Sequence, residues 1–357
     1  LPDYRYKLFE LLPLPVEANS GAVTRTEWTE PDVNPYVIRR APFTIYDVLR
    51  PCTNVITAQG AVMALAFRCK VDTQQREVKK WEFVVSHNGI SRKLTFEVEV
   101  FPAIVPEAGR SDHKYINWFN CKAIATYHHA PLFSEEWYHI FEQYLRLGKY
   151  GRQNMVLLSL DLYFELQNGT PCLNEERLDR MIAILDKVGI YWIEGGHFAR
   201  RKDRQWEATQ AELLFTCKTI PGDGEQELTD MCRQLYAYLK KNNLTERWLQ
   251  SFLDEPLDGL ANTYTTGVQI IKNAMPGISI LDATIARETI AGTLNYWCPT
   301  ANKYEKYRSF FDERHALGEH IFVYTCLEPT GNFCNRMLDQ EKLRQVWLGW
   351  APALYEN

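Results

Sequence analysis

Residues 248–256 read Trp-Leu-Gln-Ser-Phe-Leu-Asp-Glu-Pro, and this stretch decides the fold that the sequence predicts. Its apolar residues predict a buried strand over 248–254, and Pro256 ends that strand because proline cannot donate a ladder hydrogen bond. Helical sequence follows over 262–274. A buried strand followed by a helix is the repeating unit of a parallel α/β fold.

The same unit recurs on both sides of this stretch after residue 115. Ser134 and Asn174 stand where the N-caps of two helices are expected, and further helices are expected over 225–241, 304–317 and 340–350. Strands are expected over 121–128, 154–162, 190–197, 248–254, 278–284, 293–298 and 320–326.

Seven strand–helix units predict a (β/α)8 TIM-like barrel whose last strand lies beyond the given sequence. An open doubly wound sheet is the alternative. Such sheets bind nucleotides through a Gly-rich phosphate loop, and the sequence contains neither GxGxxG nor GxxxxGK[ST]. The barrel is therefore the favoured architecture.

The residues before the barrel follow a different pattern. Residues 93–100 alternate apolar and charged side chains after the turn sequence His87-Asn88-Gly89, which is typical of a β-hairpin. This pattern predicts an N-terminal β-sandwich. Residues 101–110 contain two prolines, a glycine and charges and are expected to be a linker. We therefore expect a sandwich domain over 1–110 and a barrel domain over 111–357.

Charge and composition exclude several classes of protein. Hydrophobic residues make up 46% of the chain, which is typical of a globular protein. The net charge is −5 and the sequence has no basic stripe, so binding to nucleic acid is not expected. No run of 18 apolar residues occurs, so no membrane span is expected. Neither CxxC nor HExxH occurs, so no metal and no cofactor are expected.

The sequence is compatible with more than one cellular location for the protein. Nine scattered cysteines, an odd number, favour a cytoplasmic location over a disulfide-bonded exterior one. The chain begins at Leu1 rather than Met, so secretion after removal of a leader is the alternative.

The expected strand ends carry the candidate site. Barrel enzymes place their catalytic residues at the carboxyl ends of the strands. Asp254 and Glu255 are the main candidates, because two adjacent carboxylates at the end of an apolar strand are costly to bury without a function. Substrate contacts are expected from polar and aromatic residues at other strand ends: Tyr127, His128, His197, Asp282, Trp297 and Tyr324.

Adjacent carboxylates favour one kind of chemistry. Most glycosidases hold two carboxylates ~5 to 9 Å apart on different elements. Neighbouring residues suit instead the substrate-assisted exception, in which the 2-acetamido oxygen of the sugar attacks its own anomeric carbon. One carboxylate then stabilises the amide, and the other protonates the leaving oxygen. The aromatic fraction of 13% fits sugar binding, because flat sugar faces stack on rings.

The chain resembles glycoside hydrolase family 123 and the related domain of unknown function 4091. The resemblance rests on residues 252–256, on residues 296–299, on residues 323–326 with Pro329, and on the final helical stretch 343–350. Residues 11–16 and 34–40 are similar to the β-sandwich that precedes such barrels.

The resemblance implies a retaining, exo-acting enzyme similar to an N-acetyl-β-galactosaminidase, with a terminal amino sugar of a glycan or glycoconjugate as its substrate. Asp254 would stabilise the acetamido group and the oxazolinium ion, and Glu255 would be the general acid/base. Two alternatives stay open. The first is a non-catalytic barrel that binds glycans, and the second is a metal-dependent hydrolase that uses His128, His197 and Asp282.

Overall fold

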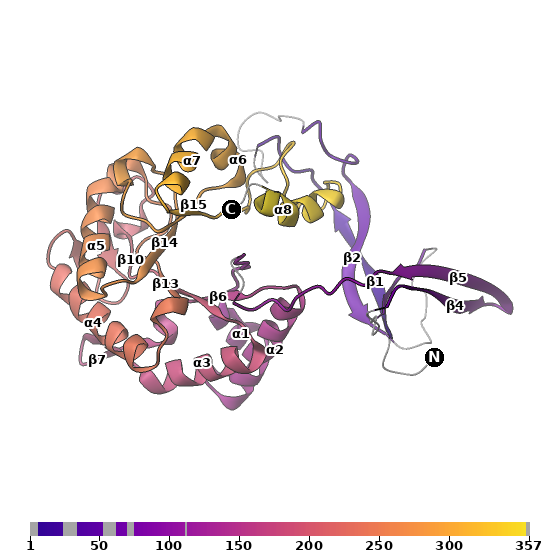
Figure 1. Cartoon of the computed structure of the whole chain (residues 1–357), viewed down its shortest axis with the longest axis horizontal. Helices are drawn as coiled ribbons and strands as arrows, with labels where there is room; N and C mark the ends of the chain where they lie inside the picture. Colours follow the sequence, from indigo (N-terminus) through magenta and orange to yellow (C-terminus); the bar gives the residue numbers. More distant parts are fainter. Residues whose placement is uncertain (1–5, 24–33, 53–61, 70–74, 111–112, 355–357) are drawn as a thin grey trace. The chain divides into compact units, whose positions relative to one another are not determined.

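The chain forms two compact units in the structure, which is a computed structural model (Figure 1). The first comprises Leu1–Asn19 and Val37–Glu107, and the second comprises Ser20–Tyr36 and Ala108–Asn357. The expected domain division at residue 110 stays a prediction. The structure describes residues 6–23, 34–52, 62–69, 75–110 and 113–354.

The first unit is rich in antiparallel strands. Strand β1 (Tyr6–Val16) pairs with β2 (Phe43–Pro51) on one side and with β3 (Ala64–Cys69) on the other. Strands β4 (Glu77–His87) and β5 (Ile90–Val100) form a separate hairpin. This unit is the strand-rich N-terminal region that the sequence predicts.

The hairpin between β4 and β5 has the expected two-residue turn. Asn88 and Gly89 have φ angles of 47° and 76°. Two successive positive φ angles match the twist of the strands. On β5, Val100 is buried, whereas Leu94 and Phe96 are exposed. The apolar face of the hairpin is therefore only partly covered, and a complete β-sandwich stays a prediction.

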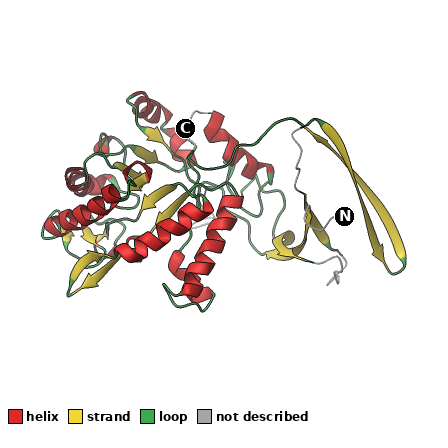
Figure 2. Ribbon diagram, turned by 60° about the horizontal axis from the view of Figure 1, so that its bottom comes forward, coloured by secondary structure: helices red, strands yellow, loops and turns green. Residues whose placement is uncertain are grey.

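The second unit is built on a six-stranded parallel sheet (Figure 2). Each strand lies beside the strand that precedes it in this series, and the order never reverses. A doubly wound sheet reverses its order at a switch point, whereas the strands of a barrel follow one another round the axis. The strands are β6 (Met155–Leu158), β9 (Trp192–Gly195), β13 (Trp248–Gln250), β14 (Ser279–Ala283), β15 (Tyr296–Cys298) and β16 (His320–Ile321).

Helices follow one another round the outside of this sheet (Figure 1). The Ser134 and Asn174 side chains cap α2 and α3 as expected, by accepting hydrogen bonds from the N–H groups of Trp137 and Arg177. The expected helix over 304–317 is divided in two at Tyr307. Among the described helices none is long and apolar enough to cross a membrane. The larger helices are α2 (Glu135–Tyr150), α3 (Glu175–Val188), α4 (Glu225–Lys241), α5 (Ala261–Ala274), α6 (Ala301–Lys306), α7 (Arg308–Ala316) and α8 (Leu343–Leu354).

The strand expected over 121–128 is wrong, because these residues form helix α1 (Cys121–Tyr127). The Asn120 side chain accepts hydrogen bonds from the backbone N–H groups of Lys122 and Ala123 and so starts the helix. The edge of the sheet beside β6 is reached instead by Tyr115, whose carbonyl accepts hydrogen bonds from the N–H groups of Asn154 and Met155. The (β/α)8 barrel therefore stays a prediction beyond the described parallel sheet.

Short elements in the loops complete the second unit, and the sequence pattern did not reveal them. One is a hairpin of β7 (Phe164–Gln167) and β8 (Thr170–Leu173). The other is a three-stranded antiparallel sheet of β10 (Ala199–Arg201), β11 (Ala211–Leu213) and β12 (Thr219–Ile220). Single 3-10 turns occur at Leu160–Leu162, Lys202–Arg204, Thr245–Arg247, Asp258–Leu260 and Glu288–Ile290.

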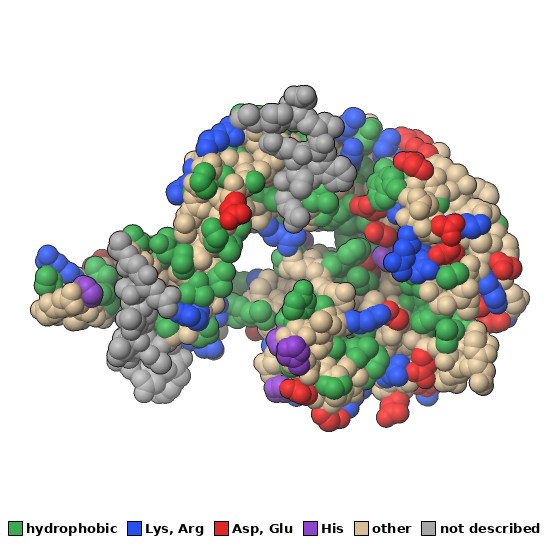
Figure 3. Space-filling view, turned by 180° about the vertical axis from the view of Figure 1, so that it is seen from behind, with side chains coloured by type: hydrophobic (Ala, Val, Ile, Leu, Met, Phe, Trp, Pro, Cys, Tyr) green, Lys and Arg blue, Asp and Glu red, His purple; other side chains and the backbone are tan. Residues whose placement is uncertain are grey.

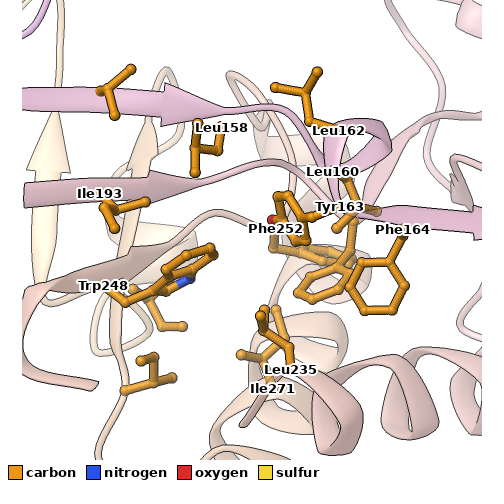
Figure 4. Close-up of a cluster of buried hydrophobic side chains, with 14 of the residues drawn as sticks. Leu158, Leu160, Leu162, Tyr163, Phe164, Ile193, Leu235, Trp248, Phe252 and Ile271 are labelled. Carbon is orange, nitrogen blue, oxygen red and sulfur yellow. The ribbon is translucent and has the colours of Figure 1, made fainter. Parts of the chain in front are cut away.

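The two faces of the parallel sheet bury different side chains. Leu158, Ile193 and Trp248, from three neighbouring strands, pack in one cluster with Leu235 of α4 and Ile271 of α5 (Figure 4). The residues next to them along the strands point the opposite way, because side chains alternate along a strand. They form a second cluster of Met155, Leu249, Leu281 and Tyr296. This alternation decides which strand residues face the helices and which face the inside of the curved sheet.

Candidate active site

Asp254 and Glu255 follow strand β13, as the sequence predicts. The chain reaches them through Phe252 and Leu253, which are buried and hold the loop in place. Glu255 has a φ angle of 48°, and its N–H donates to the carbonyl of Ala283 at 3.0 Å. A positive φ is uncommon for a residue with a side chain and is found at functional sites. The backbone is therefore tied to β14 at the pair itself.

The Glu255 carboxyl is enclosed by protein groups. The Tyr324 hydroxyl donates to its Oε1, and the Arg201 guanidinium donates to its backbone carbonyl. Burial raises the pKa of Glu255, and the nearby Asp254 charge adds to this, while the Tyr324 hydrogen bond and Arg201 oppose it. A carboxyl with a raised pKa keeps its proton to higher pH than an ordinary one, which suits a general acid.

Asp254 lines a cleft in the second unit, and its side chain is exposed there. The cleft has a volume of about 360 Å³. It adjoins a second cleft of about 430 Å³ that runs past Trp118, and the two share Leu157, Ser159 and Asp161. The first cleft is lined by Leu157, Ser159, Leu160, Asp161, Gly196, His197, Ala199, Arg200, Arg201, Arg204, Trp206, Leu214, Leu253 and Asp254.

His197 and Asp282 form a buried ion pair in the wall of this cleft. Their Nε2 and Oδ1 atoms are 3.4 Å apart. The other oxygen of Asp282 accepts from the Phe252 N–H at 3.0 Å and from the Tyr264 hydroxyl at 2.6 Å. Burial disfavours the charged imidazole, but the Asp282 carboxylate outweighs this, and with Asp254 and Glu194 it raises the pKa of His197 to about 9. We therefore expect His197 to be positively charged at neutral pH, in the cleft that Asp254 also lines.

Glu194, on β9, is a further buried carboxyl of the second unit. Its side chain accepts from the Trp118 indole N–H at 2.8 Å and from the Ser251 hydroxyl at 3.4 Å. Burial raises the pKa of Glu194 to about 7, against the opposing charge of His197. A buried carboxyl of this kind is a frequent mark of a functional site.

Gly195 and Gly196 serve packing within the protein. An added Cβ on Gly196 would lie 2.3 Å from the backbone nitrogen of Leu160, and one on Gly195 would lie 2.5 Å from the Gln250 side chain. Both glycines therefore face other parts of the protein rather than open space. They allow the loop after β6 to pass close to the end of β9.

The structure brings together part of the predicted site. Glu255 and Tyr324 are hydrogen-bonded, and Asp254 and His197 line the same cleft. Asp282 is 0% exposed and supports His197 from behind, so it lies beneath the cleft surface.

The remaining predicted contacts lie elsewhere. Tyr127, at the end of α1, is 80% exposed, and its neighbour His128 contacts the Tyr144 hydroxyl at 3.0 Å. Trp297 is fully buried against Phe310 and Phe311 of α7. Because Tyr296 and Cys298 face the inner side of the sheet, alternation points Trp297 toward the helices.

Sequence reasoning missed four residues of the site. Glu194 stood inside an expected strand, and a charge in an apolar run is the signal that could have marked it. Trp118 precedes α1, and no pattern marked it. Arg201 and Trp206 belong to β10 and the loop after it, a region to which no element had been assigned.

The metal-dependent alternative needs His128, His197 and Asp282 to meet. Across residues 6–354, leaving aside the gaps in the described ranges, no group of three or more His, Cys, Asp or Glu side chains is placed to hold a metal ion. His128 instead contacts Tyr144, and Asp282 is occupied by Tyr264 and the Phe252 backbone.

Comparisons with known proteins agree with this architecture. The family model for the catalytic domain of glycoside hydrolase 123 matches residues 118–357, which is well over half of the chain. No curated protein matches the sequence.

One solved structure is similar in fold, and a second gives a weaker match. A family 123 glycoside hydrolase from Clostridium perfringens, studied for glycolipid glycan hydrolysis, has a TM-score of 0.69 at 13% identity; the match covers 99% of this chain and 64% of that one. A β-D-glucuronidase from Dictyoglomus thermophilum has a TM-score of 0.37 at 11% identity, covering 78% of this chain and 48% of that one. This chain thus spans somewhat less than two thirds of the Clostridium perfringens protein.

Proposed function

Because this chain belongs to glycoside hydrolase family 123, we propose that it hydrolyses the glycosidic bond of a terminal 2-acetamido-2-deoxy-β-sugar, with retention and with the substrate's own acetamido group as nucleophile. The proposed enzyme is an exo-N-acetyl-β-hexosaminidase that prefers a galactosamine substrate. It would act on a terminal amino sugar of a glycan or glycoconjugate.

One observation carries the proposal: two adjacent carboxylates after β13 have different surroundings. Asp254 is exposed in the cleft beside the His197 cation, whereas Glu255 is partly buried, hydrogen-bonded by Tyr324, and has a raised pKa. Such surroundings favour a proton on Glu255, as the role of general acid requires. Two neighbouring residues could not face each other across a sugar ring as nucleophile and acid.

The proposed reaction has two steps. In the first, the acetamido oxygen attacks the anomeric carbon, the bond to the leaving oxygen breaks, and Glu255 gives its proton to that oxygen. Asp254 accepts the hydrogen bond of the acetamido N–H and offsets the positive charge of the oxazolinium ion. In the second, Glu255 takes a proton from water, the water oxygen bonds to the anomeric carbon, and the bond between that carbon and the acetamido oxygen breaks, which restores the 2-acetamido group.

The first test uses paired chromogenic β-glycosides, one with a 2-acetamido group and one with a 2-hydroxyl, each in gluco and galacto forms. Turnover confined to the acetamido substrates is expected, since only they contain the nucleophile. Turnover of the 2-hydroxyl sugars would require a carboxylate nucleophile and would contradict the proposal. If no substrate turns over while glycans still bind, the chain is a glycan-binding protein instead.

Two variants separate the roles of the pair. Glu255→Gln should lose more activity on poor leaving groups than on activated aryl glycosides, because only poor leaving groups need the proton. Asp254→Asn should slow both kinds of substrate alike, because it acts on the acetamido step. Equal losses on both leaving groups in Glu255→Gln would remove Glu255 from the role of acid.

A further inference from the structure

One wall of the first cleft is rich in arginine, and the proposed reaction does not use this feature. Arg200 and Arg201 lie on β10, and Arg204 lies in the loop that follows it. Arg200 is neutralised by Glu212 of β11, since its Nε is 2.7 Å from a Glu212 oxygen. Arg204 is exposed and forms no ion pair with any residue in the described ranges. One arginine of the wall is therefore paired and another is available.

Arg201 and Trp206 form a mixed surface in the same wall. The Arg201 guanidinium carbon lies 4.1 Å from the centre of the Trp206 ring. The Nε atom of Arg201 is buried and has no hydrogen-bond partner within the described part of the chain. Trp206 is 49% exposed. An exposed indole beside a guanidinium offers one surface for a sugar ring and another for an anion.

The loop that carries Arg204 has a defined shape. Asp203 and Arg204 have φ angles of 53° and 56°, so two successive residues with side chains adopt the left-handed conformation. That conformation is unfavourable and persists where surrounding contacts impose it. Glu212 contacts this turn, because it binds Arg200 and also accepts from the Asp203 N–H at 3.4 Å. In this conformation of the loop, Arg204 lines the cleft.

The charges within the cleft do not cancel. Asp161 is paired with Lys122, and His197 is paired with Asp282. Asp254 is therefore the lining carboxylate left to oppose Arg201 and Arg204. Over the face of the second unit in Figure 3, basic and acidic side chains are interspersed. Two guanidinium groups in the lining thus face one carboxylate, and guanidinium groups bind sulfate and carboxylate oxygens with paired N–H donors.

We infer that this cleft binds a terminal amino sugar that carries a sulfate ester, with Arg204 and Arg201 contacting the sulfate and Trp206 packing against the sugar. The inference rests on the proposed function for the placement of the acetamido group at Asp254, which lines the same cleft. At about 360 Å³ the cleft is near the small end of ligand sites, roughly 300–1,000 Å³, so one substituted sugar fills it better than a chain of sugars.

The test compares aryl 2-acetamido-2-deoxy-β-glycosides with and without a sulfate at O4 or O6, and a disaccharide whose second sugar is a uronic acid. For the unmodified protein, kcat/KM should be about tenfold higher or more for a sulfated than for the unsulfated aryl glycoside. Arg204→Gln should reduce that ratio about tenfold, and Arg204→Lys should restore part of it. Higher salt should reduce the ratio in the unmodified protein.

Lys202→Gln is the matched control. It removes one positive charge from the same loop, but Lys202 does not line the cleft and is hydrogen-bonded to Gln210. The sulfate preference should be unchanged in this variant. An equal loss in Lys202→Gln would show that only the general charge of the loop matters and would overturn the inference.

Direct binding separates this inference from the proposed function. The dissociation constants of the 6-sulfated and unsulfated N-acetylhexosamine are measured by calorimetry with the unmodified protein and with Arg204→Gln. Sulfate-dependent binding that needs Arg204, without turnover of any glycoside, would support the inference and contradict the proposed function. Turnover of the unsulfated glycoside without any sulfate preference would overturn the inference alone. A preference for the uronic acid disaccharide alone would overturn the placement of the anion on the terminal sugar.

Discussion

The hydroxyl of Tyr324 donates a hydrogen bond to Oε1 of Glu255, although 69 residues separate them in the chain. Glu255 follows β13 and Tyr324 follows β16, and two strands of the sheet lie between these. The contact exists because all these strands are parallel and end at the same edge. It gives the proposed acid a fixed donor and a defined orientation.

Removing this hydrogen bond should move the pH dependence of the reaction. The Tyr324 hydrogen bond lowers the pKa of Glu255, so in Tyr324→Phe that pKa rises further. A general acid works only while protonated, and the alkaline limb of the kcat/KM profile should therefore move to higher pH. We also expect kcat to fall by roughly tenfold, as is typical for a lost hydrogen bond to a charged group.

The profile belongs to the coupled Asp254–Glu255 pair rather than to one residue, so both limbs must be measured. Tyr236→Phe is the control, since the Tyr236 hydroxyl donates to the Pro276 carbonyl at the surface. An alkaline limb that stays in place in Tyr324→Phe would contradict the role given to this hydrogen bond.

The buried His197–Asp282 pair should make stability depend on pH. The pKa of His197 rises from an ordinary 6.5 to about 9 in the folded protein. The stabilisation from this shift is complete below pH 6.5 and is lost as pH rises through about 9. The free energy of unfolding should therefore fall across this window by up to about 3 kcal/mol.

The double variant His197→Gln/Asp282→Asn should lack most of this fall, because its amides do not titrate and can still accept from Tyr264 and Phe252. Denaturant unfolding at several values between pH 6.5 and 9.5 measures the difference. Glu194 titrates in a lower window, as its pKa moves from 4.5 to about 7, so the values above pH 7.5 are the decisive ones. Parallel pH curves for the two proteins would show that the pair does not carry the effect.

We expect Trp297 to contribute to the free energy of unfolding rather than to substrate binding. Trp297→Phe removes the hydrogen bond from its indole N–H to Glu319, 2.5 Å long, and leaves a small void against α7. A loss of about 1–3 kcal/mol in the free energy of unfolding is expected. KM should stay within about twofold.

Trp118→Phe is the comparison variant. Trp118 is half exposed, lines the second cleft and donates a hydrogen bond to Glu194. That variant should raise KM. If Trp297→Phe raised KM at unchanged stability, Trp297 would belong with the substrate contacts after all.

Gly196→Ala should be strongly destabilising. Its Cβ would lie 2.3 Å from the Leu160 backbone nitrogen, and a backbone neighbour cannot move aside as a flexible side chain can. We expect a loss of about 3 kcal/mol or more in thermal or denaturant unfolding. Gly349→Ala is the matched control: it lies in α8 with nothing within 4 Å of the added carbon, and alanine should stabilise the helix by about 0.5–1 kcal/mol. Similar effects at both positions would exclude the steric explanation.

The sequence by itself determined the repeating α/β pattern and the main carboxylates. Buried strands with a continuous apolar run and amphipathic helices with capping residues are local features, and Ser134, Asn174 and the helix over 225–241 were found where expected. The residues after β13 stand at a strand end in any parallel arrangement, so Asp254 and Glu255 could be selected without knowing what they contact.

Only the tertiary structure decided which residues reach the cleft and which distant residues contact each other. Both depend on which face of a strand or helix is covered, and on the neighbour that covers it. Residues 121–128 are apolar enough for a strand, yet the Asn120 cap makes them a helix. Strand alternation sends Trp297 and Asp282 toward the helices, so a residue at a strand end need not reach the cleft. The partnership of Tyr324 with Glu255, and the arginine wall with Trp206, join segments far apart in the chain, and no local pattern encodes such contacts.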